Sequence, residues 1–145
     1  MEALKEVRDL VSDDMEKMIA LVAHDAKKKE LIEFAQNHRD VLSRHRLVAT
    51  GTTGAILRRE AHLAVSRMES GPLGGDLQIG GKIVGGEIKA VIFLRDPLTA
   101  HPHDPDIAAL MKVCDIHNIP LATNIATAEM LMFFLKDRSL SAAAR

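Results

Sequence analysis

The chain of 145 residues is poor in aromatic side chains: it has four Phe, no Tyr and no Trp. Proteins that bind single-stranded nucleic acid stack the bases on aromatic rings, and this chain has almost none to offer. Its charge is nearly balanced, since 19 Lys and Arg face 20 Asp and Glu, so it lacks the basic surface that attracts nucleic acid or an anionic membrane. We therefore expect a small polar ligand, and neither nucleic acid nor a membrane as a partner.

Cysteine and long apolar runs are scarce as well. Cys114 is the only cysteine, which excludes an internal disulfide and a cysteine-based zinc site and fits a reducing cytoplasm. The longest uncharged apolar runs, such as Met130 to Leu135, fall far short of the roughly 20 residues of a membrane-spanning helix. Residues 1–17 carry more acidic than basic side chains and lack the apolar centre of a secretory signal. We expect a cytoplasmic protein.

The length suits one globular domain with two short flanking segments. In residues 1–17, Leu4, Val7 and Leu10 stand at helical spacing among charged residues, which predicts a short surface helix ahead of the domain. Residues 18–137 are expected to form the domain. Residues 138–145, rich in Ser and Ala, are expected to form a C-terminal tail.

A buried strand followed by a helix recurs through the domain. Met18 to Ala23 is a continuous apolar run typical of a buried strand, and Lys27 to His38 shows the spacing of an amphipathic helix. Further strands are predicted at Arg46 to Thr50, Leu63 to Met68, Lys89 to Leu94 and Pro120 to Thr123, and further helices at Thr53 to Glu60, Asp76 to Val84, Pro105 to His117 and Thr127 to Lys136. Five such units predict an α/β fold, a parallel sheet covered on both faces, because each crossover needs a helix to return the chain.

Glycine is missing from most of the chain, since all nine lie between Gly51 and Gly86. Glycine is needed where φ is positive or where the backbone must approach a ligand closely. The concentration predicts loops of special geometry in the middle of the chain. Composition alone leaves open whether these loops are only turns or form a binding site.

Polar residues cluster after each predicted strand. The clusters are His24-Asp25 with Lys28, Thr50 to Gly54, Ser70 to Asp76, Asp96 with His101 to Asp106, and Thr123-Asn124. In a doubly wound parallel sheet the ligand binds beyond the carboxyl ends of the strands, where the strand order reverses. All of these clusters are therefore expected at one edge of the sheet.

The segment Thr50 to Gly54 lies between a strand and a helix start, where free backbone N–H groups and hydroxyls favour an anion. It is a candidate cradle for a phosphate or a carboxylate, although Thr52 or Thr53 could instead cap the helix. It is neither a Walker P-loop nor a dinucleotide fingerprint, so ATP is not implied. Lys28 could reach the same anion, or it could belong with its lysine neighbours to a solvated face.

Two further clusters offer proton-transfer groups. Asp76 follows a glycine-rich loop, where it could act as a general base or could cap a helix. His101 and His103, with Asp104 and Asp106, could ligate a metal ion. A single histidine that polarises a carbonyl or shuttles a proton is the favoured interpretation, because the cluster lacks a clear third and fourth ligand.

Taken together, several of these segments resemble the methylglyoxal synthase family over residues 18–135. They are Ala20 to Asp25, Ala49 to Gly54, Ser70 to Asp76, Asp96 to Leu98, Pro102 to Asp106 and Ile119 to Asn124. The resemblance implies a doubly wound five-stranded sheet of order 3-2-1-4-5 in three α/β/α layers, and a homohexamer. It implies a carbon–oxygen lyase that converts dihydroxyacetone phosphate to methylglyoxal and inorganic phosphate, a bypass of glycolysis, with phosphate as an inhibitor. No metal or organic cofactor is expected.

The resemblance also implies roles for individual residues. Asp76 matches the catalytic base, and His103 matches the histidine that polarises the carbonyl and shuttles a proton. The positions that bind substrate and phosphate match His24, Lys28, Thr50, Gly51, Thr52, Thr53, Ser70 and Gly71, and the supporting acids match Asp25, Asp96 and Asp106. The family's pocket often receives an arginine from near the C-terminus of a neighbouring subunit, for which this chain offers Arg138 or Arg145.

Two other functions remain open on sequence grounds. The same fold serves as a regulatory module that binds a phosphate or nucleotide without turnover, although the presence of both Asp76 and His103 speaks against it. A phosphate-accepting signalling receiver would need a pair of acids after the first strand, where Asp25 supplies only one.

Overall fold

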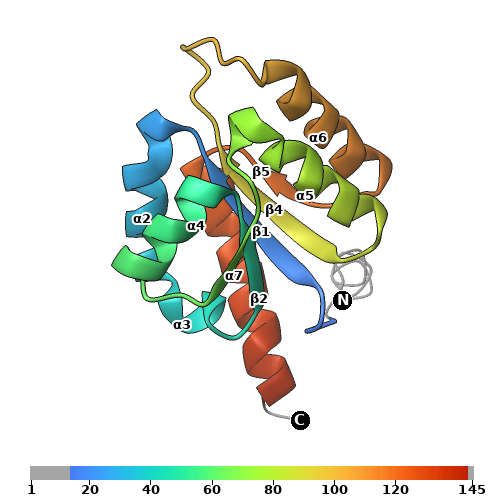
Figure 1. Ribbon diagram of the computed structural model, residues 1–145. Helices are drawn as coiled ribbons and strands as arrows, with labels where there is room; N and C mark the ends of the chain where they lie inside the picture. The colour runs from blue at the N-terminus through green and yellow to red at the C-terminus, as the bar shows by residue number, and fades with distance from the viewer. Residues whose placement is uncertain (1–13, 144–145) are drawn as a thin grey trace.

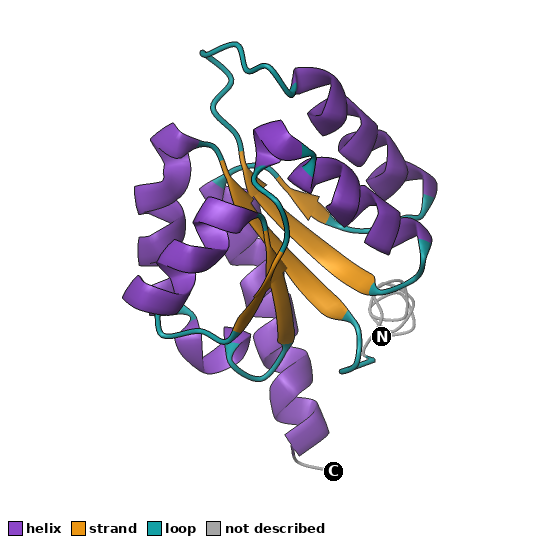
Figure 2. Ribbon diagram, in the orientation of Figure 1, coloured by secondary structure: helices purple, strands orange, loops and turns teal. Residues whose placement is uncertain are grey.

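The structure is a computed structural model that describes residues 14–143, with side chains up to residue 136. The surface helix expected in residues 1–17 lies almost wholly outside the described residues. A sheet of five parallel strands forms the centre of the molecule (Figure 2). The strands are β1 (Met18–Ala23), β2 (Arg46–Ala49), β3 (Val65–Arg67), β4 (Ile88–Leu94) and β5 (Leu121–Ala122), in the order β3-β2-β1-β4-β5. The predicted parallel sheet and its order are confirmed.

Helices cover both faces of this sheet (Figure 1). Helices α2 (Lys28–Asn37), α3 (Arg39–Leu42), α4 (Gly51–Glu60) and α7 (Ile125–Ala143) pack on one face, and helices α5 (Gly75–Val84) and α6 (Asp104–Ile116) pack on the other. Two short 3₁₀ turns, η1 (Asp25–Lys27) and η2 (Gly71–Leu73), follow β1 and β3. The three layers of the predicted architecture are therefore present.

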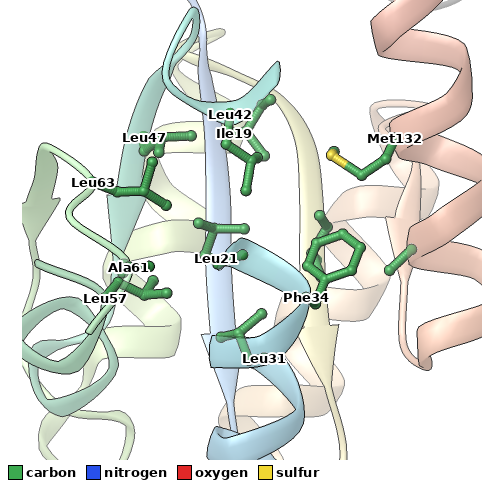
Figure 3. Close-up of a cluster of buried hydrophobic side chains, with 14 of the residues drawn as sticks. Ile19, Leu21, Leu31, Phe34, Leu42, Leu47, Leu57, Ala61, Leu63 and Met132 are labelled. Carbon is green, nitrogen blue, oxygen red and sulfur yellow. The ribbon is translucent and has the colours of Figure 1, made fainter. Parts of the chain in front are cut away.

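Alternation along the central strands divides the core into two parts. In β1, Ile19 and Leu21 face the larger cluster with Leu31 and Phe34 of α2 (Figure 3), whereas Ala20 lies in the cluster under α5 and α6. Every residue of β1 and β4 is buried, because each strand has a neighbour on both sides and helices above and below. This burial explains why both strands are continuous apolar runs in the sequence, with Lys89 as the exception.

Lys89 is 2% exposed, and it sits where the register between β1 and β4 shifts by one residue. Such an irregularity redirects a side chain out of the usual alternation. The Lys89 Nζ atom lies 2.9 Å from His45 Nδ1 and donates to the Asp14 carbonyl oxygen at 3.3 Å. The lysine thus ties the segment before β1 to the amino end of the sheet.

The chain differs from the sequence-based expectation at several element boundaries. The four-residue helix α3, which was not predicted, buries Val41 and Leu42 but is too short to show a helical period. Strands β3 and β5 are shorter than predicted and lie at the two edges of the sheet. Helix α7 continues past residue 137 into the segment expected as the C-terminal tail, residues 138–145, and ends at Ala143.

The end of α5 accounts for one glycine that had no predicted role. Gly86 has a φ of 75°, and its N–H donates to the Ile83 carbonyl while the Glu87 N–H donates to the Lys82 carbonyl. These two hydrogen bonds form a Schellman motif, in which glycine is the usual left-handed residue.

Among the described helices, none has the length and apolar character needed to cross a membrane.

The connections also define where a ligand can bind. The chain moves outward from β1 through β2 to β3 and then returns to the other side of β1 to form β4. The strand order therefore reverses between β1 and β4, and a crevice is expected beyond the carboxyl ends of these strands. Helix α2 approaches this point from one face of the sheet, and helices α5 and α6 approach it from the other (Figure 1).

Candidate active site

A cavity of about 310 Å³ lies beyond the carboxyl ends of the strands. Most of the predicted site residues line it, namely His24, Asp25, Lys28, Thr50, Thr52, Thr53, Ser70, Gly71, Asp76 and His103. The structure thus brings together residues from four separate segments of the sequence. This volume suits a small ligand, in line with the expectation from the lack of aromatic residues.

Three predicted residues do not line the cavity but adjoin it. Gly51 begins α4, and a Cβ added there would lie 3.1 Å from the Ser70 nitrogen, so glycine permits α4 to approach the segment after β3. Asp96 donates its backbone N–H to His24 Nδ1 at 2.8 Å. Asp106 lies in the first turn of α6, and its charge contributes to raising the pKa of Asp76.

Asp76 is completely buried, at 0% exposure, in the first turn of α5. Neither carboxylate oxygen has a hydrogen-bond partner, and the N-cap residue of α5 is Gly74, so Asp76 does not cap the helix. Burial raises the pKa of Asp76; His103 opposes this rise and Asp106 adds to it. A carboxylate with a raised pKa and free oxygens is a stronger base than one in water.

His103 lies beside this carboxylate. Its Nε2 atom lies 3.5 Å from Asp76 Oδ2, and the ring is buried. His103 is also the N-cap residue of α6, and its carbonyl accepts from the Asp106 and Ile107 N–H groups. The helix start therefore fixes the position of the imidazole relative to Asp76.

Glycines in the loop after β3 make this arrangement possible. A Cβ added at Gly71 would lie 2.8 Å from His103 Nε2, and a Cβ at Gly75 would overlap the Glu69 carbonyl oxygen. Gly74 has a φ of 97°, a conformation that favours glycine. The bare backbone thus lets the loop pass beside His103 and deliver Asp76 at the start of α5.

His24 lies at the end of β1 with one nitrogen bonded and one nitrogen free. Its Nδ1 atom accepts the Asp96 N–H, while its buried Nε2 atom has no hydrogen-bond partner. Burial, followed by the nearby His101 and His103, lowers the pKa of His24 to about 4. The ring is therefore neutral at pH 7, and since Nδ1 is an acceptor, the proton must be on Nε2. His24 is thus a hydrogen-bond donor on the wall of the cavity.

The start of α4 is the segment predicted as an anion cradle, and it has free donors. Thr50 is the N-cap residue, yet its side chain makes no capping hydrogen bond, and Thr52 and Thr53 lie within the first turn of the helix. The interpretation of Thr52 or Thr53 as a cap is therefore wrong. The first hydrogen bond of the helix runs from the Gly54 N–H to the Thr50 carbonyl, which leaves the N–H groups of Thr52 and Thr53 without a partner inside the helix. These donors and the threonine hydroxyls converge on the cavity.

Lys28 faces the cavity and is distinct from its lysine neighbour. Its side chain is 18% exposed and forms an ion pair with Asp25, which holds the pKa of that carboxyl below its usual range. Lys27 instead pairs with Glu30 at 3.4 Å. The structure therefore does not support a common solvated lysine face, and it places one cation beside the cradle.

The histidine cluster has the geometry of a stack and not of a metal site. The rings of His24 and His101 lie 3.8 Å apart at 13°, and parallel rings cannot both direct a lone pair at one ion. His101 Nδ1 lies 3.7 Å from Asp104 Oδ1. Within residues 14–136, no group of three or more His, Cys, Asp or Glu side chains is arranged to hold a metal ion.

Some lining residues were not predicted as part of the site. They are Val22, Ala23, Pro72, Phe93 and Pro102, whereas His101, which also lines the cavity, was considered from the sequence only as a metal ligand or proton carrier. The Phe93 ring packs nearly perpendicular to the His24 ring, with centroids 5.1 Å apart. Its place near the end of a predicted strand could have indicated this contact. The side chains of Arg138 and Arg145, the candidates to complete the pocket, lie outside the described residues.

The fold and the cavity together define a doubly wound α/β protein with a polar crevice at the point where the strand order reverses. A sequence model described as the MGS-like domain matches residues 30–123. The chain is 56% identical over 120 residues to a methylglyoxal synthase of Thermus thermophilus, covering 83% of this chain and 95% of that protein. It is 59% identical over 114 residues to a methylglyoxal synthase of Burkholderia multivorans, covering 79% and 88%.

A solved structure supports the same relationship. The crystal structure of a methylglyoxal synthase from Elizabethkingia anophelis aligns with a TM-score of 0.76 at 45% identity, covering 81% of this chain and 78% of that one. The chain belongs to the methylglyoxal synthase family.

Proposed function

We propose that the protein is a lyase that converts dihydroxyacetone phosphate to methylglyoxal and inorganic phosphate. Family membership supports the activity, and one observation carries the assignment to a site. The buried Asp76 has two unpartnered oxygens, lies 3.5 Å from His103, and shares one cavity with the cradle at the start of α4. A base, a proton carrier and an anion cradle are the three parts that this reaction needs.

The first step is enolisation. Asp76 removes a proton from the hydroxymethyl carbon of the substrate, which is acidified by the adjacent carbonyl. The C–H electron pair moves into a new carbon–carbon double bond, and the negative charge that develops on the carbonyl oxygen is met by a hydrogen bond from His103. His24 Nε2–H adds a second donor on the same wall of the cavity. The product is an enediolate with its phosphate still attached.

The second step is loss of phosphate. A proton first moves, through His103, from the hydroxyl on the deprotonated carbon to the enediolate oxygen. The alkoxide left behind then becomes an aldehyde carbonyl, the C=C electron pair shifts to form a double bond to the carbon that carries the phosphate, and the C–O bond to phosphate breaks with its electrons going to phosphate. This bond breaks readily only when it stands perpendicular to the enediolate plane, where it overlaps the π system. The Thr52 and Thr53 N–H groups, the hydroxyls and Lys28 hold the phosphate in that position and stabilise its charge as it leaves. The enol that remains tautomerises to methylglyoxal.

The proposal extends to assembly, regulation and location. We infer a homohexamer in the cytoplasm, without a metal or organic cofactor, that is inhibited by inorganic phosphate because the product fits the same cradle as the substrate's phosphate. The exposed Met130 and Phe133 side chains on α7 are apolar surface that an assembly could cover.

The direct test is to incubate the protein with dihydroxyacetone phosphate and measure methylglyoxal and inorganic phosphate. We expect equal amounts of both products, and we expect a chelator to have no effect. Binding of phosphate without turnover would instead favour the regulatory module, and inhibition by the chelator would revive the metal interpretation of His101 and His103.

A matched pair of lysine variants tests the phosphate cradle. Lys28→Met is expected to lower kcat/KM by about 10- to 100-fold, since it removes a charged contact to phosphate. Lys27→Met removes a cation one residue away that pairs with Glu30 and does not line the cavity, so it should leave kcat/KM unchanged. Equal effects of the two variants would contradict the assignment of Lys28.

A further inference from the structure

His101 lies on a loop that has no regular structure of its own. This loop joins β4 to α6 and projects beyond the carboxyl end of the sheet (Figure 1), and Leu98 on it is 94% exposed. The returning part of the loop carries His101, Pro102 and His103 back to the cavity. Its position therefore depends on the contacts that these residues make.

His101 makes contacts in two directions. On one side, its backbone N–H donates to Asp104 Oδ2 at 3.1 Å, and its Nδ1 atom lies 3.7 Å from Asp104 Oδ1. On the other side, its ring lies flat against His24, with ring centroids 3.8 Å apart and planes at 13°. The His103 ring is nearly perpendicular to the His101 ring, at 69°, with centroids 5.6 Å apart. His101 thus connects the first turn of α6 to the end of β1.

The His24 ring makes four contacts, one of which is a nearly perpendicular approach to the His103 ring at 77°, with centroids 5.7 Å apart. Asp96 N–H bonds to Nδ1, which sets which nitrogen is the acceptor. Phe93 meets the ring at 77°, and His101 covers one flat face. The hydrogen bond alone permits the ring to tilt about the bonded nitrogen, whereas a parallel ring at van der Waals distance opposes that tilt. His101 is therefore the contact that fixes the plane of His24.

We propose that His101 is a positioning residue: by stacking on His24 it holds that imidazole in the plane in which Nε2 directs its proton into the cavity. The proposal rests on the proposed function, because the donated hydrogen bond matters only if a substrate oxygen accepts it. His101 acts through His24, and its own nitrogens need not touch the substrate.

The charges around the stack favour a neutral His24. His101, His103 and Arg95 face this ring and lower its pKa together with burial, while Asp96 opposes them. Asp104 faces His101 from α6. Loss of the His101 ring would open one face of His24 to water and remove one neighbouring charge. Both changes should move the pKa of His24 upward, from about 4 toward 6.5.

Two substitutions distinguish the effect of the stacked ring from the effect of the imidazole nitrogens of His101. His101→Ala removes the stack and is expected to lower kcat about tenfold with KM changed less than about twofold, since misorientation of a donor acts mainly on the transition state. His101→Phe keeps a flat ring, and we expect kcat within about threefold of the unchanged protein. His117→Ala, at an exposed histidine after α6, is the control and should have no effect.

The deciding measurement is the ring ¹⁵N NMR spectrum of His24, assigned by its loss in His24→Asn and recorded between pH 4 and 8. We expect the Nε2–H tautomer in all three proteins, because the Asp96 hydrogen bond sets it, with a low pKa in the unchanged protein, a small rise in His101→Phe and a larger rise in His101→Ala, where one face of the His24 ring is also open to water. An unchanged His24 spectrum in His101→Ala would overturn the proposal, whether or not kcat falls. Since the spectrum needs no turnover, failure to release methylglyoxal would reject the proposed function while still leaving this test decisive.

Discussion

The two ends of the sheet treat buried polar groups in opposite ways. At the amino end, the buried Lys89 is hydrogen-bonded to the Asp14 carbonyl and lies 2.9 Å from His45 Nδ1. At the carboxyl end lie the buried side-chain atoms that lack a hydrogen-bond partner in the described part of the chain. They are His24 Nε2, both Asp76 oxygens, Arg95 Nε, His101 Nδ1 and His103 Nδ1. Folded proteins satisfy nearly all such atoms, so this concentration agrees with the proposal that a ligand binds at the carboxyl end.

The difference also separates stability from function. An unsatisfied buried polar group costs roughly 1–3 kcal/mol, so each of these atoms weakens the folded state. The groups at the amino end stabilise the fold, because their partners are built in. Substitutions of buried polar groups at the carboxyl end should therefore lower turnover without lowering the unfolding free energy. Substitutions of buried polar groups at the amino end should lower the unfolding free energy without lowering turnover.

The largest effect is expected at Asp76. Asp76→Asn keeps the shape of the side chain but removes the base, so kcat should fall by at least about 100-fold. The unfolding free energy should not fall, because burial raises the pKa of Asp76 and so penalises the charge that the substitution removes. The checks are kcat with dihydroxyacetone phosphate and urea unfolding at pH 7.

Asp115→Asn, at an exposed position of α6, is the control for this experiment and should change neither quantity. A large loss of stability in Asp76→Asn would mean that the carboxylate is a structural partner, and the comparison of the two ends would fail.

The opposite signature is expected at Lys89. Lys89→Ala leaves a cavity and removes the donor to the Asp14 carbonyl, so the unfolding free energy should fall by about 3 kcal/mol. The kcat of the protein that remains folded should be unchanged, because Lys89 lies at the far end of β4 from the cavity. Urea unfolding and turnover per folded molecule measure the two quantities; loss of turnover without loss of stability would contradict the assignment. Lys89→Met, which restores most of the volume, should recover part of the loss.

Lowering the pH should reduce the unfolding free energy, because His24 at the carboxyl end of the sheet has a lowered pKa. The pKa of His24 is about 4 in the folded chain and 6.5 in the unfolded chain, so the unfolded state takes up a proton first as the pH falls. The stability contribution of His24 is thus complete above pH 6.5 and is lost between pH 6.5 and 4, by about 2 kcal/mol at pH 4.5. Unfolding curves of the unchanged protein and of His24→Asn at pH 7 and 4.5 isolate this residue. Parallel losses in the two proteins would show that His24 titrates normally.

Much of the fold could be predicted because it depends on residues close in sequence. Met18 to Ala23 was predicted to the residue, since a central parallel strand is apolar on both faces. Helix α3 could not be predicted, because its formation depends on Val41 and Leu42 packing into a core assembled from distant segments. The burial of Lys89 was equally hidden, because its partner His45 lies 44 residues earlier in the chain.

The site shows the same limit. The clusters after the strands could be assigned to one edge, because parallel strands all end there. The stack of His101 on His24 could not, because it depends on the course of the loop between β4 and α6, for which the sequence has no period. The sequence likewise did not show that Asp76 is buried without capping the helix. The reason is that Gly74, and not Asp76, is the N-cap residue of α5.

The smallest effect is expected from glycine-to-alanine substitutions at the two ends of α5, which compare the two ends of the sheet with one kind of change. Helix α5 runs from the cavity toward the amino end, and a Cβ added at Gly81 meets no atom within 4 Å. Gly81→Ala should therefore raise the unfolding free energy by about 0.5–1 kcal/mol, since alanine loses less backbone entropy in a helix, and should leave kcat unchanged. At Gly75 the same change forces a Cβ against the Glu69 carbonyl and should lower both stability and kcat. Thermal unfolding and turnover of the two variants measure this contrast, and a stabilising Gly75→Ala would show that the approach of the loop to α5 is not required.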